Sequence, residues 1–185
     1  ESERLTRLIN QVLDLAKLES GGAEWHLTAV DMKELIGDVL AGMSPMFTEK
    51  GIRVVSHLPA RVDPVHADLD RVIQVLLNLL SNAVKFCAVE DGRIEVTLTQ
   101  TGDGLRVDVR DNGPGIAAED QAIIFEKFRQ AGDTLTGKPQ GTGLGLPISR
   151  KIVEYLGGRL WVESRPGEGT CFSFSLPLLQ PEKFV

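Results

Sequence analysis

The sequence predicts an α+β fold in which helices stack on one face of a mixed β-sheet. Two kinds of pattern predict it: apolar residues recur at helical spacing in some segments, and apolar and polar residues alternate at strand spacing in others. Elements of both kinds in one chain are typical of helices packed on a sheet around one core. The length of 185 residues suits one such domain with an appendage.

Residues 1–20 are predicted to form a helix with a single apolar stripe, made of Leu5, Leu8, Val12 and Leu15 and widened by Ile9 and Ala16. That stripe suits a bundle or coiled coil, since a lone helix of this length cannot bury its apolar face. Gly21 and Gly22 end the helix. A short strand over 27–30 and a second helix from about 32 to 50 follow.

Further along, the apolar period becomes two, which predicts a strand over 52–56. Asp68 is a suitable N-cap for a third helix. That helix covers 70–86 and has a buried stripe of Val72, Val75, Leu76, Leu79, Leu80 and Ala83. Strands over 93–99 and 105–111 come next, joined by a glycine-rich turn.

Residues 112–143 are rich in glycine and contain one short apolar patch, 123–128. A segment this long with little regular structure is usually a functional loop or lid. A helix over 144–156 and strands over 159–164 and 170–176 complete the predicted domain.

Composition excludes some classes of function. The net charge is −6, without clustered Lys or Arg, so we expect no binding to nucleic acid. No apolar run approaches the roughly 18 residues that cross a bilayer, so we expect no membrane contact by this chain. Cys87 and Cys171 lie far apart and are predicted to be free thiols of a reducing, cytoplasmic compartment.

Three polar residues on the helix over 70–86 form the first candidate site. Asn78, Asn82 and Lys85 are spaced i, i+4 and i+7, so they share one face. Two carboxamide oxygens one turn apart can hold a hydrated magnesium ion, and a lysine one turn on can reach phosphates that share the ion. Taken alone, the same pattern is also typical of a solvated helix face.

The second candidate is D-N-G-P-G-I at 111–116, at the end of a strand. It predicts at least a turn. The Asp111 carboxylate could also accept a hydrogen bond from the amine of adenine and discriminate against guanine, which has a carbonyl there. Gly113 and Gly115 would let the backbone approach the base.

The third candidate is G-T-G-L-G-L at 141–146, directly before a predicted helix. Free backbone N–H groups at a helix start bind phosphates. No strand of a βαβ unit precedes the motif, which argues against a Rossmann dinucleotide site, and the G-K-[ST] of a P-loop is missing.

The order of these motifs resembles the GHKL, or Bergerat-fold, ATPases, and within them the sensor histidine kinases of two-component signalling. N-x-x-x-N-x-x-K-F, D-N-G-P-G-I, F-E-K-F, G-T-G-L-G-L and G-E-G-T follow one another within 30–178. The resemblance implies a Bergerat-type α/β sandwich, with a mostly antiparallel sheet covered on one face by three helices and preceded by one bundle helix. It also implies ATP and Mg²⁺ as ligands.

The resemblance assigns roles to single residues. Asn82 would bind Mg²⁺ with Asn78 lining the same site, Lys85 would contact phosphate, and Asp111 would bind the adenine amine. A mobile lid would cover 129–140, with Arg129 and Lys138 near the phosphates. The other implied nucleotide contacts are Phe86, Gly113, Gly115, Ile116, Phe128, Gly141, Thr142, Gly143, Leu144, Gly145, Leu146 and Thr170.

The resemblance also implies a division of the chain. Residues 1–22 would be the second helix of a dimerisation and phosphotransfer hairpin, 23–180 the catalytic domain and 181–185 a tail. The first helix of that hairpin, with the acceptor histidine, would precede residue 1. None of His26, His57 or His66 has the acidic neighbour of an acceptor, so we expect no phosphoacceptor here and no self-phosphorylation.

The implied partners are ATP or ADP, the histidine-bearing hairpin of the parent kinase, and a response regulator. The parent would be a homodimer with this part in the cytoplasm, whether or not it is anchored in a membrane.

Other functions remain open. Asn78 stands where ATP-hydrolysing relatives carry a glutamate; a carboxamide cannot take a proton from water, which favours a kinase. Anti-sigma serine kinases share the pocket, but the helix over 1–20 argues against them. A non-catalytic nucleotide-binding module and a helix-mediated dimerisation scaffold are the alternatives from other classes.

Overall fold

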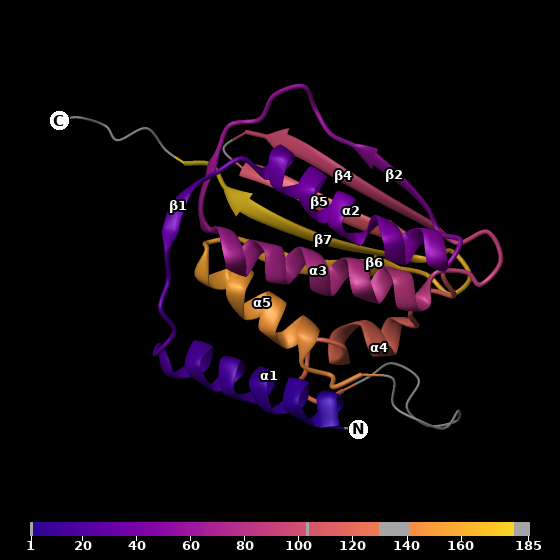
Figure 1. Cartoon of the computed structure of the whole chain (residues 1–185), viewed down its shortest axis with the longest axis horizontal. Helices are drawn as coiled ribbons and strands as arrows, with labels where there is room; N and C mark the ends of the chain where they lie inside the picture. The colour runs from indigo at the N-terminus through magenta and orange to yellow at the C-terminus, as the bar shows by residue number, and fades with distance from the viewer. Residues whose placement is uncertain (1, 103, 130–140, 180–185) are drawn as a thin grey trace.

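The computed structural model describes residues 2–102, 104–129 and 141–179 (Figure 1). Its elements, in chain order, are α1 (Ser2–Ser20), β1 (Leu27–Val30), α2 (Met32–Glu49), β2 (Arg53–His57), β3 (Val65–Asp68), α3 (Leu69–Phe86), β4 (Arg93–Thr101), β5 (Gly104–Asp111), α4 (Ala118–Ile123), α5 (Gly145–Tyr155), β6 (Arg159–Ser164) and β7 (Thr170–Pro177).

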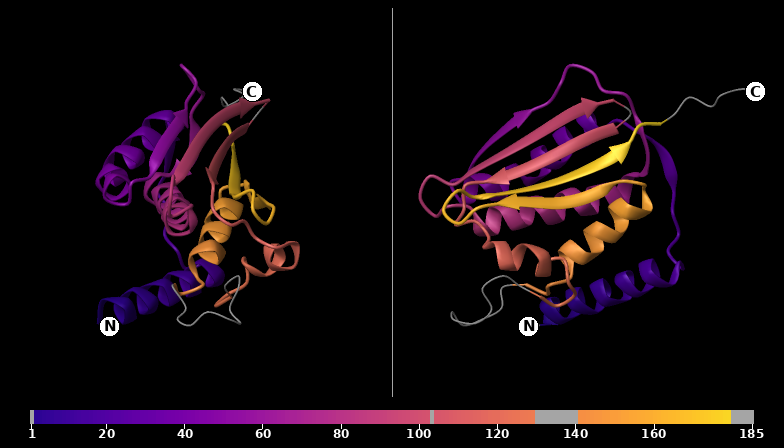
Figure 2. Two further views of the ribbon diagram at one scale, coloured as in Figure 1. Left: turned by 90° about the vertical axis from the view of Figure 1, so that its right-hand side faces the viewer. Right: turned by 180° about the vertical axis from the view of Figure 1, so that it is seen from behind.

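Five of the strands form one twisted sheet in the order β2-β4-β5-β7-β6. The β2–β4 pair is parallel and the other three pairs are antiparallel. Helices α2, α3 and α5 lie on one face of the sheet, and the opposite face carries no helix of the described residues (Figure 2). The predicted fold class, a mostly antiparallel sheet covered on one face by three helices, is confirmed.

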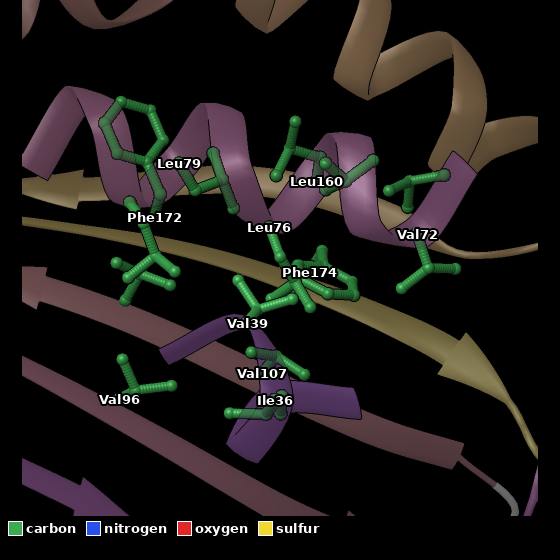
Figure 3. Close-up of a cluster of buried hydrophobic side chains, with 14 of the residues drawn as sticks. Ile36, Val39, Val72, Leu76, Leu79, Val96, Val107, Leu160, Phe172 and Phe174 are labelled. Carbon is green, nitrogen blue, oxygen red and sulfur yellow. The ribbon is translucent and has the colours of Figure 1, made fainter. Parts of the chain in front are cut away.

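The core lies between this sheet and the three helices (Figure 3). The sheet contributes alternate residues, such as Val96 of β4, Val107 of β5 and Phe174 of β7, each at most 1% exposed. Leu76 and Leu79 of α3 pack on them and are equally buried. Each such side chain stabilises the fold by about 1.5–3 kcal/mol relative to an exposed one, so α3 is firmly seated on the sheet.

The N-terminus of α3 is capped as predicted. The Asp68 carboxylate accepts a hydrogen bond from the Arg71 N–H (3.1 Å). Its second oxygen accepts from the His26 N–H (2.8 Å), which lies in the segment after α1. One carboxylate therefore starts the helix and ties the preceding linker to it.

Two short elements were not predicted. β3 pairs antiparallel with β1, with Val30 opposite Val65, and its four residues give too short a pattern to recognise. α4 has no buried residue and no side-chain cap, so neither the apolar period nor a cap indicates it in the sequence. β2 begins one residue later than predicted.

The apolar stripe predicted for α1 is present, but only one part of it is buried against the rest of the chain. Leu15 is 6% exposed, and Leu8 and Leu18 pack against the core cluster. The adjoining part of the helix surface leaves four apolar side chains 41–59% exposed, namely Leu5, Ile9, Val12 and Leu13. No helix of the described residues is long and apolar enough to cross a bilayer.

Candidate functional site

The three candidate motifs meet at one end of the sheet. The C-terminal half of α3 lies beside the first turn of α5, and the end of β5 lies beside the start of β7 (Figure 1). The loop after β5 and the loop between β6 and β7 close this end, because the Gly167 N–H donates to the Pro114 carbonyl at 2.7 Å. Segments far apart in the chain thus surround one region.

Asp111 is the buried carboxyl of this region, with 6% of its surface exposed. The Gly113 N–H donates to its Oδ1 at 2.8 Å, and the Thr170 N–H also bonds the carboxylate. Burial raises the pKa of Asp111, and these two hydrogen bonds lower it by less. None of the ion pairs among the described residues includes Asp111. The site therefore holds a desolvated acceptor without a cationic partner.

Glycines around Asp111 allow the loops to come this close. A Cβ on Gly113 would overlap the Phe86 carbonyl, and one on Gly115 would overlap the Arg165 carbonyl. A Cβ on Gly169 would overlap the carbonyl of Asp111 itself. The prediction that Gly113 and Gly115 bring the backbone to a ligand stays untested, because the close approach seen here is to the protein's own backbone.

Two further residues hold this end together, and no pattern in the sequence indicates them. Ser164 accepts from the Ile116 N–H and donates to the Gly169 carbonyl, both at 2.8 Å, and lies 3.0 Å from the Thr170 hydroxyl. Gln121 of α4 donates to the carbonyls of Ile116 (2.9 Å) and Ser164 (2.8 Å). These bonds fix the walls of the Asp111 region.

The α3 residues Asn78, Asn82 and Lys85 lie along one partly buried face, as their spacing predicts. The Asn78 amide donates from Nδ2 to the Ser149 hydroxyl of α5 at 3.0 Å. Burial lowers the pKa of Lys85, whose ammonium lies 4.5 Å from the centre of the Phe86 ring. Phe86 is half exposed, so an aromatic face and a cation border the site from the end of α3.

The glycine loop at 141–146 leads into α5. The Leu144 N–H donates to the Thr142 hydroxyl (3.3 Å), which in turn donates to Gln11 of α1 (2.6 Å). Leu144 is fully buried, so its side chain belongs to the core and only its backbone could face a ligand. No side chain of the described residues caps the start of α5, so its first amide groups are suited to an anion.

Phe128 and the glycine loop are joined by a hydrogen bond from the Phe128 N–H to the Gly143 carbonyl (3.0 Å). Phe128 has a φ of +61° and a side chain that is 60% exposed, and Gly143 has a φ of +69°. Leu146 is half-buried against the core. Most of the predicted lid, including Lys138, lies outside the described residues; Arg129 forms an ion pair with Glu126 at 3.5 Å.

The donor set fits ATP with magnesium. Two carboxamides one turn apart, Asn78 and Asn82, are neutral oxygen donors, and Mg²⁺ needs few of these when water and phosphates supply the rest. The start of α5 and Lys85 suit phosphates, and the buried Asp111 carboxylate suits a hydrogen-bond donor such as an amine. The structure thus brings together the predicted residues of all three motifs that it describes.

The family model for histidine kinase-, DNA gyrase B- and HSP90-like ATPases matches residues 67–180. Sensor histidine kinase AruS of Pseudomonas aeruginosa is 39% identical over 180 residues, which is 95% of this chain and 18% of AruS. The chain therefore spans less than a fifth of that relative.

Two solved proteins have similar structures. Full-length ShkA in complex with AMPPNP has a TM-score of 0.83 and 35% identity, over 96% of this chain and 36% of ShkA. The catalytic domain of histidine kinase ThkA has a TM-score of 0.71 and 34% identity, over 83% of this chain and 96% of that domain. ThkA in complex with response regulator TrrA has a TM-score of 0.77 and 31% identity, over 99% of this chain and 49% of ThkA.

This chain belongs to the histidine kinase-, DNA gyrase B- and HSP90-like ATPase family, and within it resembles the catalytic domains of sensor histidine kinases of two-component signalling.

Proposed function

We propose that this member of the family binds ATP with Mg²⁺ and transfers the γ-phosphoryl group to a histidine on a phosphotransfer helix. The observation that carries the proposal is Asp111. A buried carboxyl without a cationic partner reduces stability. It is well placed to accept the exocyclic amine of adenine, with Gly113, Gly115, Ile116 and Thr170 around it, and Phe86 and Phe128 offer aromatic surface.

The phosphates would lie between α3 and the start of α5. Lys85 and the backbone amides of the glycine loop, 141–145, would neutralise their charge, as the dipole of α5 also would. Asn82, with Asn78 beside it, would hold Mg²⁺. The ion would supply charge neutralisation at the phosphate oxygens and would orient the γ-phosphoryl group.

The chemistry needs no strong base from this chain. A neutral imidazole nitrogen of the acceptor histidine can attack the γ-phosphorus, and the bond to the bridging oxygen breaks so that ADP leaves with the electron pair. The protein's part is positioning and charge stabilisation. Asn78 cannot take a proton from water, which supports phosphotransfer over hydrolysis.

The partners follow from the same proposal. Residues 1–22 would be the second helix of the dimerisation hairpin, 23–180 the catalytic domain and 181–185 a tail. The acceptor histidine would come from the other hairpin helix, in a homodimeric, cytoplasmic part of the parent. A response regulator would receive the phosphoryl group on an aspartate, and the complex of ThkA with TrrA supports a partner of this kind.

A second candidate is a module that dimerises through α1 and binds nucleotide without catalysis. The exposed apolar side chains of α1, Leu5, Ile9, Val12 and Leu13, favour association. Sedimentation that finds a clean monomer at high concentration would exclude a dimerisation role for this chain by itself.

The test is calorimetric titration with ADP and with GDP, each with Mg²⁺, for the wild type and for Asp111→Asn. We expect adenine-selective binding, weakened about 100-fold in the variant because an acceptor that faces the amine is replaced in part by a donor. Asp108→Asn is the matched control, since Asp108 lies on the same strand but on the open face of the sheet.

The kinase step is then tested with a separate histidine-bearing hairpin as substrate. Acid-labile phosphate on that hairpin supports the transferase. Rapid ATP hydrolysis by the chain alone would contradict the role given to Asn78, and a folded wild type that binds neither nucleotide would contradict the nucleotide site.

A further inference from the structure

The side chain of Asn78 is held from two sides by α5. Its Nδ2 donates to the Ser149 hydroxyl at 3.0 Å, and Ser149 is 1% exposed. Its Oδ1 lies against Gly145, the first residue of the helix, where any Cβ would overlap that oxygen. Gly145 and Ser149 are four residues apart, so both contacts come from one face of α5.

Two physical effects keep the amide in this orientation. The lone pairs of the Ser149 hydroxyl accept from the Asn78 Nδ2–H, which gives the amide nitrogen a buried partner on this side. The start of α5 is the positive end of its dipole and has no side-chain cap, so it favours the carboxamide oxygen over the amide nitrogen as its neighbour.

The orientation matters for a cation. Mg²⁺ or its bound water needs the oxygen of a carboxamide, and an amide rotated by 180° would present N–H groups that repel the ion. A buried neighbour that orients such a group tunes metal binding without touching the metal.

We propose that Ser149 is a positioning residue that directs the Asn78 oxygen toward the magnesium–phosphate site. This inference rests on the proposed function, because it assumes that nucleotide and Mg²⁺ bind between α3 and α5. It adds a residue outside the glycine motif to the site, and it makes the coupling between Mg²⁺ and nucleotide depend on a hydrogen bond between two helices.

The test compares the ADP affinity with and without Mg²⁺ for the wild type and for Ser149→Ala. Mg²⁺ raises the ADP affinity of the wild type by some factor, and we expect this factor to be about tenfold smaller in Ser149→Ala. The affinity for ADP without Mg²⁺ should stay within about twofold of the wild-type value. The matched control is Ser173→Ala, which removes another buried serine hydroxyl, on the open face of the sheet, and should leave the effect of Mg²⁺ unchanged.

A double-mutant cycle separates positioning from structure. In an Asn78→Ala background, Ser149→Ala should cause no further loss of the Mg²⁺ effect, because the group it orients is gone. Melting temperatures of all variants establish that each is folded at the temperature of the titration.

The outcomes distinguish the two proposals. If wild type binds ADP more tightly with Mg²⁺ and Ser149→Ala keeps that gain, Ser149 is only structural and the inference is wrong. The same holds if Ser149→Ala weakens binding equally with and without Mg²⁺. If folded wild type does not bind ADP at all, the proposed function fails and the inference with it.

Discussion

Two aspartates on one strand, β5, have opposite surroundings. Asp108 faces the open side of the sheet, where Arg106 donates to it at 2.7 Å and the Ser173 hydroxyl of β7 also donates. Asp111, three residues later, faces the helices and is more deeply buried, and the described residues bond its carboxylate through backbone N–H groups alone. Each lies opposite a hydroxyl residue of β7, Ser173 and Thr170 respectively.

The comparison distinguishes an aspartate that stabilises the sheet, Asp108, from one whose surroundings suit ligand binding, Asp111. The charge of Asp108 is matched by Arg106, whose guanidinium also lies 5.0 Å from the centre of the Trp161 ring. Such a network of matched charges stabilises the sheet. Among the described residues Asp111 has no ion-pair partner where the three motifs converge, so a bound donor would stabilise it beyond its two backbone hydrogen bonds.

The largest expected effect concerns the close approach beside Asp111. Gly167 and Gly169 have the same φ of +83°, but only Gly169 lies where a Cβ would overlap a carbonyl. We expect Gly169→Ala to lower the free energy of unfolding by about 4 kcal/mol, and Gly167→Ala by only about 1–2 kcal/mol, from the backbone conformation alone. Urea denaturation of both variants measures the difference, and equal losses would mean that the overlap relaxes freely.

The next largest expected effect concerns the hydrogen bonds of Asp108 on the open face of the sheet. Asp108→Asn removes a charge-assisted hydrogen bond from Arg106 and should lower the free energy of unfolding by about 2 kcal/mol. Adenine binding should be unchanged, because Asp108 lies on the other face of the sheet. Denaturation together with ADP titration checks both parts, and weaker ADP binding by this variant would mean that the two faces are coupled.

A smaller effect concerns pH. Burial raises the pKa of Asp111 in the folded state above its unfolded value, so the folded state holds the proton more tightly. Wild type should therefore lose stability relative to Asp111→Asn as pH rises from the unfolded pKa, about 3.9, to the folded pKa, and the difference should be constant above it. Melting temperatures of both proteins between about pH 3 and pH 8 test this, since the range extends about four units above the unfolded pKa. The prediction is contradicted if the wild type becomes more stable relative to the variant as the pH rises.

The smallest effect concerns the contact between α1 and the glycine loop. Gln11 accepts the only proton of the Thr142 hydroxyl, and Thr142 still accepts from Leu144. Gln11→Ala should free that proton for a phosphate and tighten ADP binding by about two- to threefold, less than 1 kcal/mol. Asn10→Ala, an exposed neighbour on α1, is the control. Weaker binding by Gln11→Ala would mean that α1 supports the loop rather than competing for it.

Local patterns in the sequence were enough for most of the fold. The period of the apolar residues predicted α1, α3 and α5, and Asp68 was correctly predicted as the cap of α3. These features depend on residues within about four positions of one another, so they can be read without knowing the tertiary structure. The order of the motifs likewise identified the family.

The site was predicted less completely. Asn78, Asp111 and the glycine loop could be named, because each stands in a motif. Ser149 and Ser164 could not, because nothing near them in the chain distinguishes a serine that orients a site residue from any other serine. Ser149 meets Asn78 across 71 positions of sequence, and Ser164 meets Ile116 across 48.

The sequence by itself determined most of the helices and strands, though not β3 and α4, and which residue types are available for binding. Only the tertiary structure decided their partners: that part of the apolar stripe of α1 is buried, that Gly145 lies against Asn78, and that among the described residues Asp108 is paired with a cation and Asp111 is not. The physical reason is that hydrogen bonds within an element are local, whereas burial and charge pairing depend on which elements pack together.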